Sequence, residues 1–238
     1  MAAATLSSAA AVATELGPSP PLFLLFAAVC LYSANTPSSS SSTSVSSVAF
    51  VTTQGEESNI LFRSDVAHRR SDSSALFEGL EKAVSTCGIP EALCVGLGPG
   101  SYNGLRAAIA TARAFATALE LPLYALPSPI GLPGPDSGFW VVGDARGGHY
   151  WVCCIASGNF LQEPQLLPPG EILQALQAHP SFPVLSATPL PGIENLTLAT
   201  PDAGRLAILA EKADPCVGTP EPLYLKPPHI TTPRTVSA

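Results

Sequence analysis

One stretch of about thirty residues constrains the fold more than any other part of the chain. Residues 93–97 (LCVGL) are a short apolar run, residues 98–104 (GPGSYNG) are rich in glycine, and residues 105–119 carry apolar side chains at helical spacing. A second apolar run follows over residues 121–126. A strand, a helix and a strand in this order form a parallel crossover unit. The segment therefore predicts an α/β fold.

The rest of the chain predicts further strands and helices in two lobes. Strands are expected over 22–32, 45–53, 59–66, 139–144 and 149–156, and helices over 72–86, 170–178 and 201–213. The run 22–32 is too short to span a bilayer as a helix, which favours a buried strand. Residues 131–138 are rich in Pro and Gly. We therefore expect an N-terminal α/β lobe over 21–130 and a C-terminal α/β lobe with an extended tail over 131–238.

The N-terminal region and the cysteines bear on location. Residues 1–20 are rich in Ala, Ser and Pro and are expected to be a disordered leader, and the Ser-rich residues 38–47 a flexible loop between two strands. No Lys or Arg precedes Arg63, which argues against a secretory signal peptide. The six cysteines include no C-x-x-C pair, so reduced, buried thiols are expected. These features favour the cytoplasm.

Charge makes one class of function unfavourable for the isolated chain. The 238 residues include 18 acidic and 11 basic side chains, for a formal net charge of −7. A protein that binds nucleic acid on its own needs an excess of Lys and Arg to displace counterions from phosphates. The chain is poorly equipped for that task.

The glycine-rich loop has two interpretations. Glycines between a strand and a helix expose backbone amides at the helix N-terminus, so that Gly98, Gly100, Ser101 and Gly104 are candidate residues for binding an anion or a nucleotide. The loop matches neither a Walker loop, nor G-x-G-x-x-G, nor the nucleophile elbow G-x-S-x-G. The alternative is a turn that only packs the helix on the sheet.

The same residues carry a family resemblance. Residues 98–106 (GPGSYNGLR), 110–112 (ATA) and 119–122 (LELP) resemble the signature of the TsaB (YeaZ) family. Supporting matches are His68-Arg69-Arg70, Asp144-Ala145-Arg146 with Tyr150-Trp151, and residues 221–226 (EPLYLK). The resemblance implies an actin-like/Hsp70-like ATPase fold (ribonuclease H-like) with two lobes and a degenerate nucleotide site.

Departures from the family pattern weaken nucleotide and metal chemistry. Asn35 stands where the family has an Asp, and Asn103 replaces a Thr. The catalytic relative TsaD holds a metal through an H-x-x-x-H pair, whereas here His68 is followed four positions later by Asp72. The resemblance therefore implies no catalytic residues, no metal ligands and no cofactor of this chain's own, with ATP and a metal belonging to partner subunits.

The resemblance also implies where a partner binds. In the family, the first two helices pack against the equivalent pair of TsaD, and here those are residues 72–86 and 102–119. The candidate contact residues are Leu76, Phe77, Leu80, Ala108, Ala112 and Ala116. The alternative is that these apolar stripes face the chain's own sheet.

The function implied is that of a non-catalytic scaffold or activator subunit. TsaD transfers a threonylcarbamoyl group to N6 of the adenosine beside the anticodon in ANN-decoding tRNAs. This chain would pair with it as a heterodimer, join a TsaE-type ATPase in a larger complex, meet tRNA only through that complex and bind no membrane. Self-association as a homodimer is left open. The alternatives are a stand-alone metal-dependent hydrolase, glycoprotease-like or an ATPase, and a nucleotide-binding module that uses residues 98–104.

Overall fold

The computed structural model describes residues 26–34, 43–54, 57–69, 74–146 and 148–225. The leader (residues 1–20), Asn35, Asp72 and Lys226 lie outside these residues, so the predictions that involve them are not tested.

The first sheet is built from the N-terminal half of the chain. Its five strands are β1 (Phe26–Ala34), β2 (Thr43–Gln54), β3 (Glu57–Arg69), β4 (Ala92–Gly96) and β5 (Leu123–Leu126), in the order β3-β2-β1-β4-β5. Strands β1 to β3 pair antiparallel, and β4 pairs parallel with both β1 and β5. The parallel crossover predicted from the glycine-rich stretch is confirmed.

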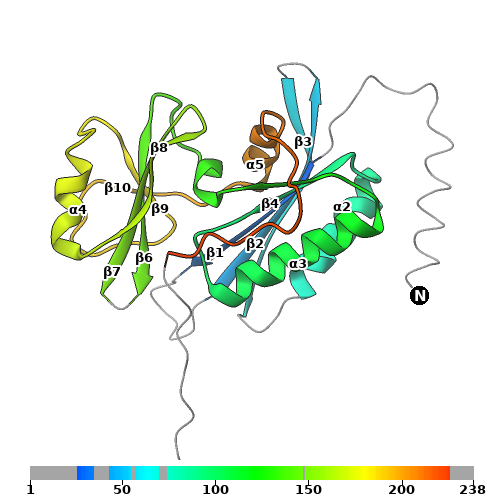
Figure 1. Ribbon diagram of the computed structural model, residues 1–238, viewed down its shortest axis with the longest axis horizontal. Helices are drawn as coiled ribbons and strands as arrows, with labels where there is room; N and C mark the ends of the chain where they lie inside the picture. The colour runs from blue at the N-terminus through cyan, green and yellow to red at the C-terminus, as the bar shows by residue number, and fades with distance from the viewer. Residues whose placement is uncertain (1–25, 35–42, 55–56, 70–73, 147, 226–238) are drawn as a thin grey trace, which may run out of the picture.

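Helices cover both faces of this sheet (Figure 1). Helices α2 (Ser74–Cys87) and α3 (Tyr102–Ala118) cover one face, where Val48 and Phe50 of β2 share a buried cluster with Leu80 of α2. On the opposite face, alternate residues of β2 pack against α5 (Ala203–Ala210). The alternation follows from the two-residue period of a strand.

The second sheet belongs to the C-terminal half. It contains β6 (Phe139–Arg146), β7 (His149–Ala156), β8 (Asn159–Leu167), β9 (Val184–Ser186) and β10 (Leu196–Leu198), in the order β10-β9-β6-β7-β8. Helix α4 (Pro169–Leu176) buries Ile172 against Trp140 and Val142 on the outer face. The hairpin of β6 and β7 was expected, whereas β8, β9 and β10 were not.

A single apolar core joins the two sheets. It includes Val51 and Cys94 from the first sheet, Val141 and Ile155 from the second, and Leu206 of α5. The sheets fall on either side of residue 131, where the short 3-10 helix η1 (Ser128–Gly131) ends, but α5 packs on the first sheet although it follows this point in the chain. The division into lobes at residue 130 stays a prediction.

The Ser-rich segment differs from its expectation. We expected residues 38–47 to be a loop, but Thr43–Ser47 belong to β2, which pairs with β1 from Thr43 opposite Ala34. Pairing on both sides satisfies the backbone of this segment, and Ser47 is 1% exposed. Among the described residues, no helix is long and apolar enough to cross a membrane.

Candidate functional site

The glycine-rich loop connects β4 to α3 by internal hydrogen bonds. Gly98 has φ +91°, and a Cβ at this position would lie 2.6 Å from Leu105 Cδ1, so the turn requires a glycine. The Gly98 N–H donates to Ser128 Oγ (3.1 Å), and the Ser128 N–H donates back to the Gly98 carbonyl (2.9 Å). The loop is thereby fixed to η1.

Ser101 acts as the N-cap of α3. Its hydroxyl accepts from the Gly104 N–H (3.3 Å), and its carbonyl accepts from the Leu105 N–H (2.9 Å). The cap thus bonds the Gly104 N–H, which has no partner within the helix, and the Leu105 bond is the first one of the helix itself. These bonds support the interpretation of a packing turn, and anion binding at Gly98, Gly100, Ser101 and Gly104 stays a prediction.

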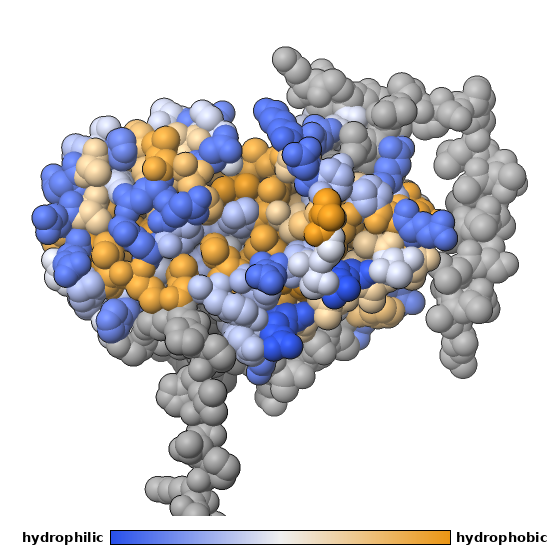
Figure 2. Space-filling model, viewed as in Figure 1, coloured by the Kyte–Doolittle hydropathy of each residue, from blue (hydrophilic) through white to orange (hydrophobic). Residues whose placement is uncertain are grey.

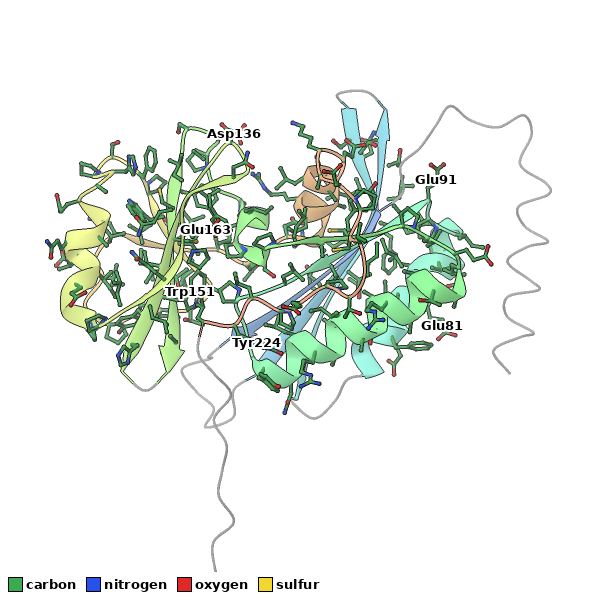
Figure 3. All side chains as sticks on the ribbon, in the orientation of Figure 1. Glu81, Glu91, Asp136, Trp151, Glu163 and Tyr224 are labelled. Carbon is green, nitrogen blue, oxygen red and sulfur yellow. The ribbon has the colours of Figure 1, made fainter. Side chains whose placement is uncertain are left out.

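The C-terminal segment lies beside this loop. The Leu223 N–H donates to the Leu97 carbonyl (2.8 Å), which ties the segment to the chain just before the glycine-rich loop. Tyr224 stacks on Tyr102 in the first turn of α3, with ring centroids 4.9 Å apart. Figure 3 shows Tyr224 next to the N-terminal end of α3. Segments more than a hundred residues apart thus meet at one surface.

An arginine completes this aromatic cluster. The Arg106 guanidinium donates to Tyr102 Oη (2.7 Å) and lies 5.3 Å from the centre of the same ring. Burial and the neighbouring Tyr102 raise the pKa of Tyr224. Sequence patterns missed this cluster: the four-residue spacing of Tyr102 and Arg106 indicates their contact, but nothing local indicates Tyr224.

The predicted partner-contact residues divide into two groups. Leu76, Leu80, Ala108, Ala112 and Ala116 are buried between the helices and the first sheet. This burial favours the alternative that these residues pack on the chain's own sheet, and their role as partner contacts stays a prediction. The apolar stripes face their own sheet because five strands expose an apolar face that the helices must cover.

Phe77 is the exception. Its side chain is 51% exposed, and its ring meets that of Phe115 edge-on across α2 and α3, with centroids 5.2 Å apart. An aromatic ring held in place yet half exposed is typical of an interface anchor. Phe77 is therefore the one predicted contact residue that lies on the surface.

The part of the chain that the structure describes contains no cluster of metal-ligating side chains. Among the described residues, no three His, Cys, Asp or Glu side chains come together as metal ligands. Asp144 and His149 are exposed in the β6–β7 hairpin.

The same hairpin contains a close packing contact. The Trp151 indole of β7 lies so near to Gly143 of β6 that a Cβ on Gly143 would lie 2.2 Å from Nε1.

Five of the six cysteines are free thiols in the structure. Cys94, Cys153 and Cys154 are buried, and Cys87 and Cys216 are partly exposed. Burial raises the pKa of Cys153 well above its ordinary value, with smaller contributions from Cys154 and Glu163. Burial is as expected for Cys94, Cys153 and Cys154 and makes them poor nucleophiles, whereas the reduced state of the thiols stays a prediction.

Comparison with known proteins identifies relatives of one part of the chain. Residues 65–132 match the family described as TsaD, tRNA N6-adenosine threonylcarbamoyltransferase. This segment runs from β3 through α2, β4 and α3 to the end of η1, and it contains the glycine-rich loop. No curated protein is a significant match to the sequence.

Solved structures match almost the whole chain. A Pseudomonas aeruginosa protein described as similar to peptidase YEAZ aligns with a TM-score of 0.63 and 18% identity, over 85% of this chain and 99% of that one. YeaZ from Pseudomonas aeruginosa aligns with a TM-score of 0.58 and 18% identity, over 79% and 91%. The fold is the actin-like (ribonuclease H-like) α/β class that the resemblance implied. The fold shared with YeaZ and the TsaD match at residues 65–132 together confirm the resemblance of this chain to the TsaB (YeaZ) family.

Proposed function

We propose that this chain is a non-catalytic scaffold subunit of a cytoplasmic tRNA-modifying complex and that it pairs with a TsaD protein. TsaD would transfer the threonylcarbamoyl group to the adenosine beside the anticodon, and a TsaE-type ATPase would join the complex. ATP and a metal would then be bound by the partner subunits, and tRNA would be met only through the assembly.

The exposed aromatic side chain on the α2–α3 face carries this proposal. Phe77 is held against Phe115 while half of its surface faces solvent. Burying the rest of this ring on a partner would stabilise a complex through apolar area that the isolated chain leaves exposed. Both helices lie within the segment that matches the TsaD family.

The glycine-rich loop supports the same proposal. Its hydrogen bonds go to Ser101 and Ser128 of this chain, as expected for a loop that positions α3. A scaffold needs α3 in a fixed place and needs no reacting group on the loop. We therefore assign the loop a structural role.

The test is association with the TsaD protein encoded by the same genome. Light scattering with size-exclusion chromatography should show a one-to-one complex for the unaltered chain, and the chain alone should not turn over ATP. Phe77→Glu should weaken the complex at least about tenfold, because a central aromatic anchor contributes a large share of binding energy. Leu173→Glu is the matched control, since Leu173 is 56% exposed but lies on α4.

Two results would overturn the proposal. Failure of the folded, unaltered chain to bind TsaD would remove the scaffold role, and metal-dependent ATP turnover by the chain alone would favour a hydrolase. Full binding by Phe77→Glu would instead show that the complex forms through a surface other than the α2–α3 face.

A further inference from the structure

The outer face of α3 has a charge pattern unlike the rest of the chain. The chain as a whole has 18 acidic and 11 basic residues, yet α3 has two arginines, Arg106 and Arg113, and no carboxylate. Both arginines are exposed, and neither forms an ion pair within the part of the chain that the structure describes. Figure 2 shows hydrophilic side chains over this helix on the face turned to the viewer.

Arg106 and Arg113 lie on the same side of α3. Arg113 lies seven positions after Arg106, which corresponds to about two turns and a rise of about 10.5 Å along one side of the helix. Ala110 and Ala114 are exposed on the same face. Small side chains beside the two arginines allow a second helix to approach closely enough for its carboxylates to reach both.

One of the arginines is held before any partner arrives. Arg106 donates to Tyr102 Oη, and Tyr102 is itself stacked on Tyr224. Tyr224 is fixed in turn because its neighbour Leu223 bonds to Leu97. A guanidinium whose position is already restricted loses less conformational entropy on binding a carboxylate.

We infer that the outer face of α3 binds a partner helix that presents two carboxylates seven residues apart, and that Tyr224 is a positioning residue for Arg106. This inference rests on the proposed function, since the partner helix is taken to belong to TsaD. Beyond that function, it specifies that arginine–carboxylate pairs form the contact, and that Tyr224 of the C-terminal segment holds one of the arginines in place.

A second copy of the chain fits this face less well. The exposed carboxylates of α2, the other helix of the surface, are Glu78 and Glu81, only three residues apart. Their separation along a helix is about 4.5 Å, so α2 of a second copy could match one arginine and not both. Charge spacing therefore favours a different protein.

The experiment measures the dissociation constant with the cognate TsaD protein at two salt concentrations. Arg106→Glu and Arg113→Glu should each weaken binding about tenfold at low salt, because each creates a like-charge contact. Binding of both variants should also depend less on salt than binding of the unaltered chain. Lys212→Glu is the matched charge reversal, because Lys212 is exposed just after α5.

Tyr224 is tested by a pair of variants. Tyr224→Phe retains the stacked ring and should bind TsaD like the unaltered chain, whereas Tyr224→Ala should bind about threefold more weakly, as expected for a loss of preorganisation. The salt dependence separates positioning from folding: Tyr224→Ala should lose part of it at an unchanged melting temperature.

The outcomes distinguish this inference from the proposed function. If the unaltered chain binds TsaD and both arginine variants bind equally well with the same salt dependence, the inference fails and the scaffold role stands. If the unaltered chain does not bind TsaD, the scaffold role fails. A homodimer that Arg106→Glu disrupts, without any binding of TsaD, would identify a second copy as the occupant and overturn the inference.

Discussion

At the scale of single residues, Gly143 and Trp151 form a close contact within the second sheet. A Cβ at position 143 would lie 2.2 Å from Nε1 and 2.3 Å from Cε2 of the indole, and the ring cannot bend away as a flexible chain end would. Gly143→Ala should therefore lower the free energy of unfolding by about 1–3 kcal/mol, as other overpacked cores do. Urea denaturation followed by tryptophan fluorescence measures the change.

Gly170→Ala is the control for that variant. Gly170 lies in α4, and a Cβ there meets no atom within 4 Å. Alanine should leave stability unchanged or raise it by up to about 1 kcal/mol, because it has the higher helix propensity. Equal effects of the two substitutions would contradict the packing of Trp151 over Gly143.

Cys153 provides a prediction about pH and reactivity. Burial raises the pKa of its thiol, so that iodoacetamide at pH 8 should modify the partly exposed Cys216 first and Cys153 only after unfolding. Mass spectrometry of native and urea-treated chains gives the order. Rapid labelling of native Cys153 would show instead that the reagent reaches this thiol within the folded second sheet.

The same thiol predicts a pH dependence of stability. The unfolded chain ionises Cys153 at lower pH than the folded chain does, so the free energy of unfolding should fall as pH rises past the ordinary pKa of 9.0.

At the scale of elements, Asp202 connects α5 to the first sheet in two ways. Its carboxylate caps the helix by accepting from the Gly204 N–H (2.7 Å) and also pairs with Arg63 of β3 (2.7 Å). Asp202→Ala should cost about 1–2 kcal/mol of stability, most of it from the lost cap. Asp202→Asn retains a capping oxygen and should cost less, because the ion pair is partly exposed.

Thermal unfolding of the two Asp202 variants gives the comparison. Equal losses would mean that the ion pair, and not the cap, accounts for the stability at this helix end. The hydrogen bond between Thr53 and Glu211 lies at the C-terminal end of α5, so neither substitution at Asp202 removes it.

The elements also show what the sequence could predict. The unit β4–α3–β5 was predicted because two of its signals are local: the spacing of its apolar residues, and the Gly-Pro-Gly turn between strand and helix. Strands β9 and β10 have three residues each and exist through pairing with each other and with β6, which no local pattern contains. Strand β8 includes Pro164, which lowers its strand signal and is tolerated at a sheet edge.

The candidate site was predictable to a smaller extent. An apolar stripe on a helix shows that something will be buried, but not whether the chain's own sheet or a partner buries it. Leu80 and Ala112 therefore looked like interface residues and are core residues. The stacking of Tyr224 on Tyr102 depends on the path of the C-terminal segment across the molecule, which only the fold determines.

At the scale of the whole molecule, the shared core argues for one folding unit. The cluster that joins the sheets includes Val51 of β2, Val141 of β6 and Leu206 of α5, so neither sheet retains a complete core without the other. Domains with cores of their own can unfold separately, whereas a shared core couples them. Loss of the second sheet would expose part of this shared cluster to solvent.

Leu206→Ala tests this coupling. Leu206 is fully buried in the shared cluster, so its truncation should cost about 2–5 kcal/mol. Both tryptophans lie in the second sheet, so their fluorescence reports on that sheet, while far-ultraviolet circular dichroism reports on both. In the unaltered chain and in the variant, the two signals should follow a single transition that the substitution shifts equally. If the two signals separate, with fluorescence unchanged by the substitution, the sheets are independent units and the division near residue 130 is a thermodynamic boundary.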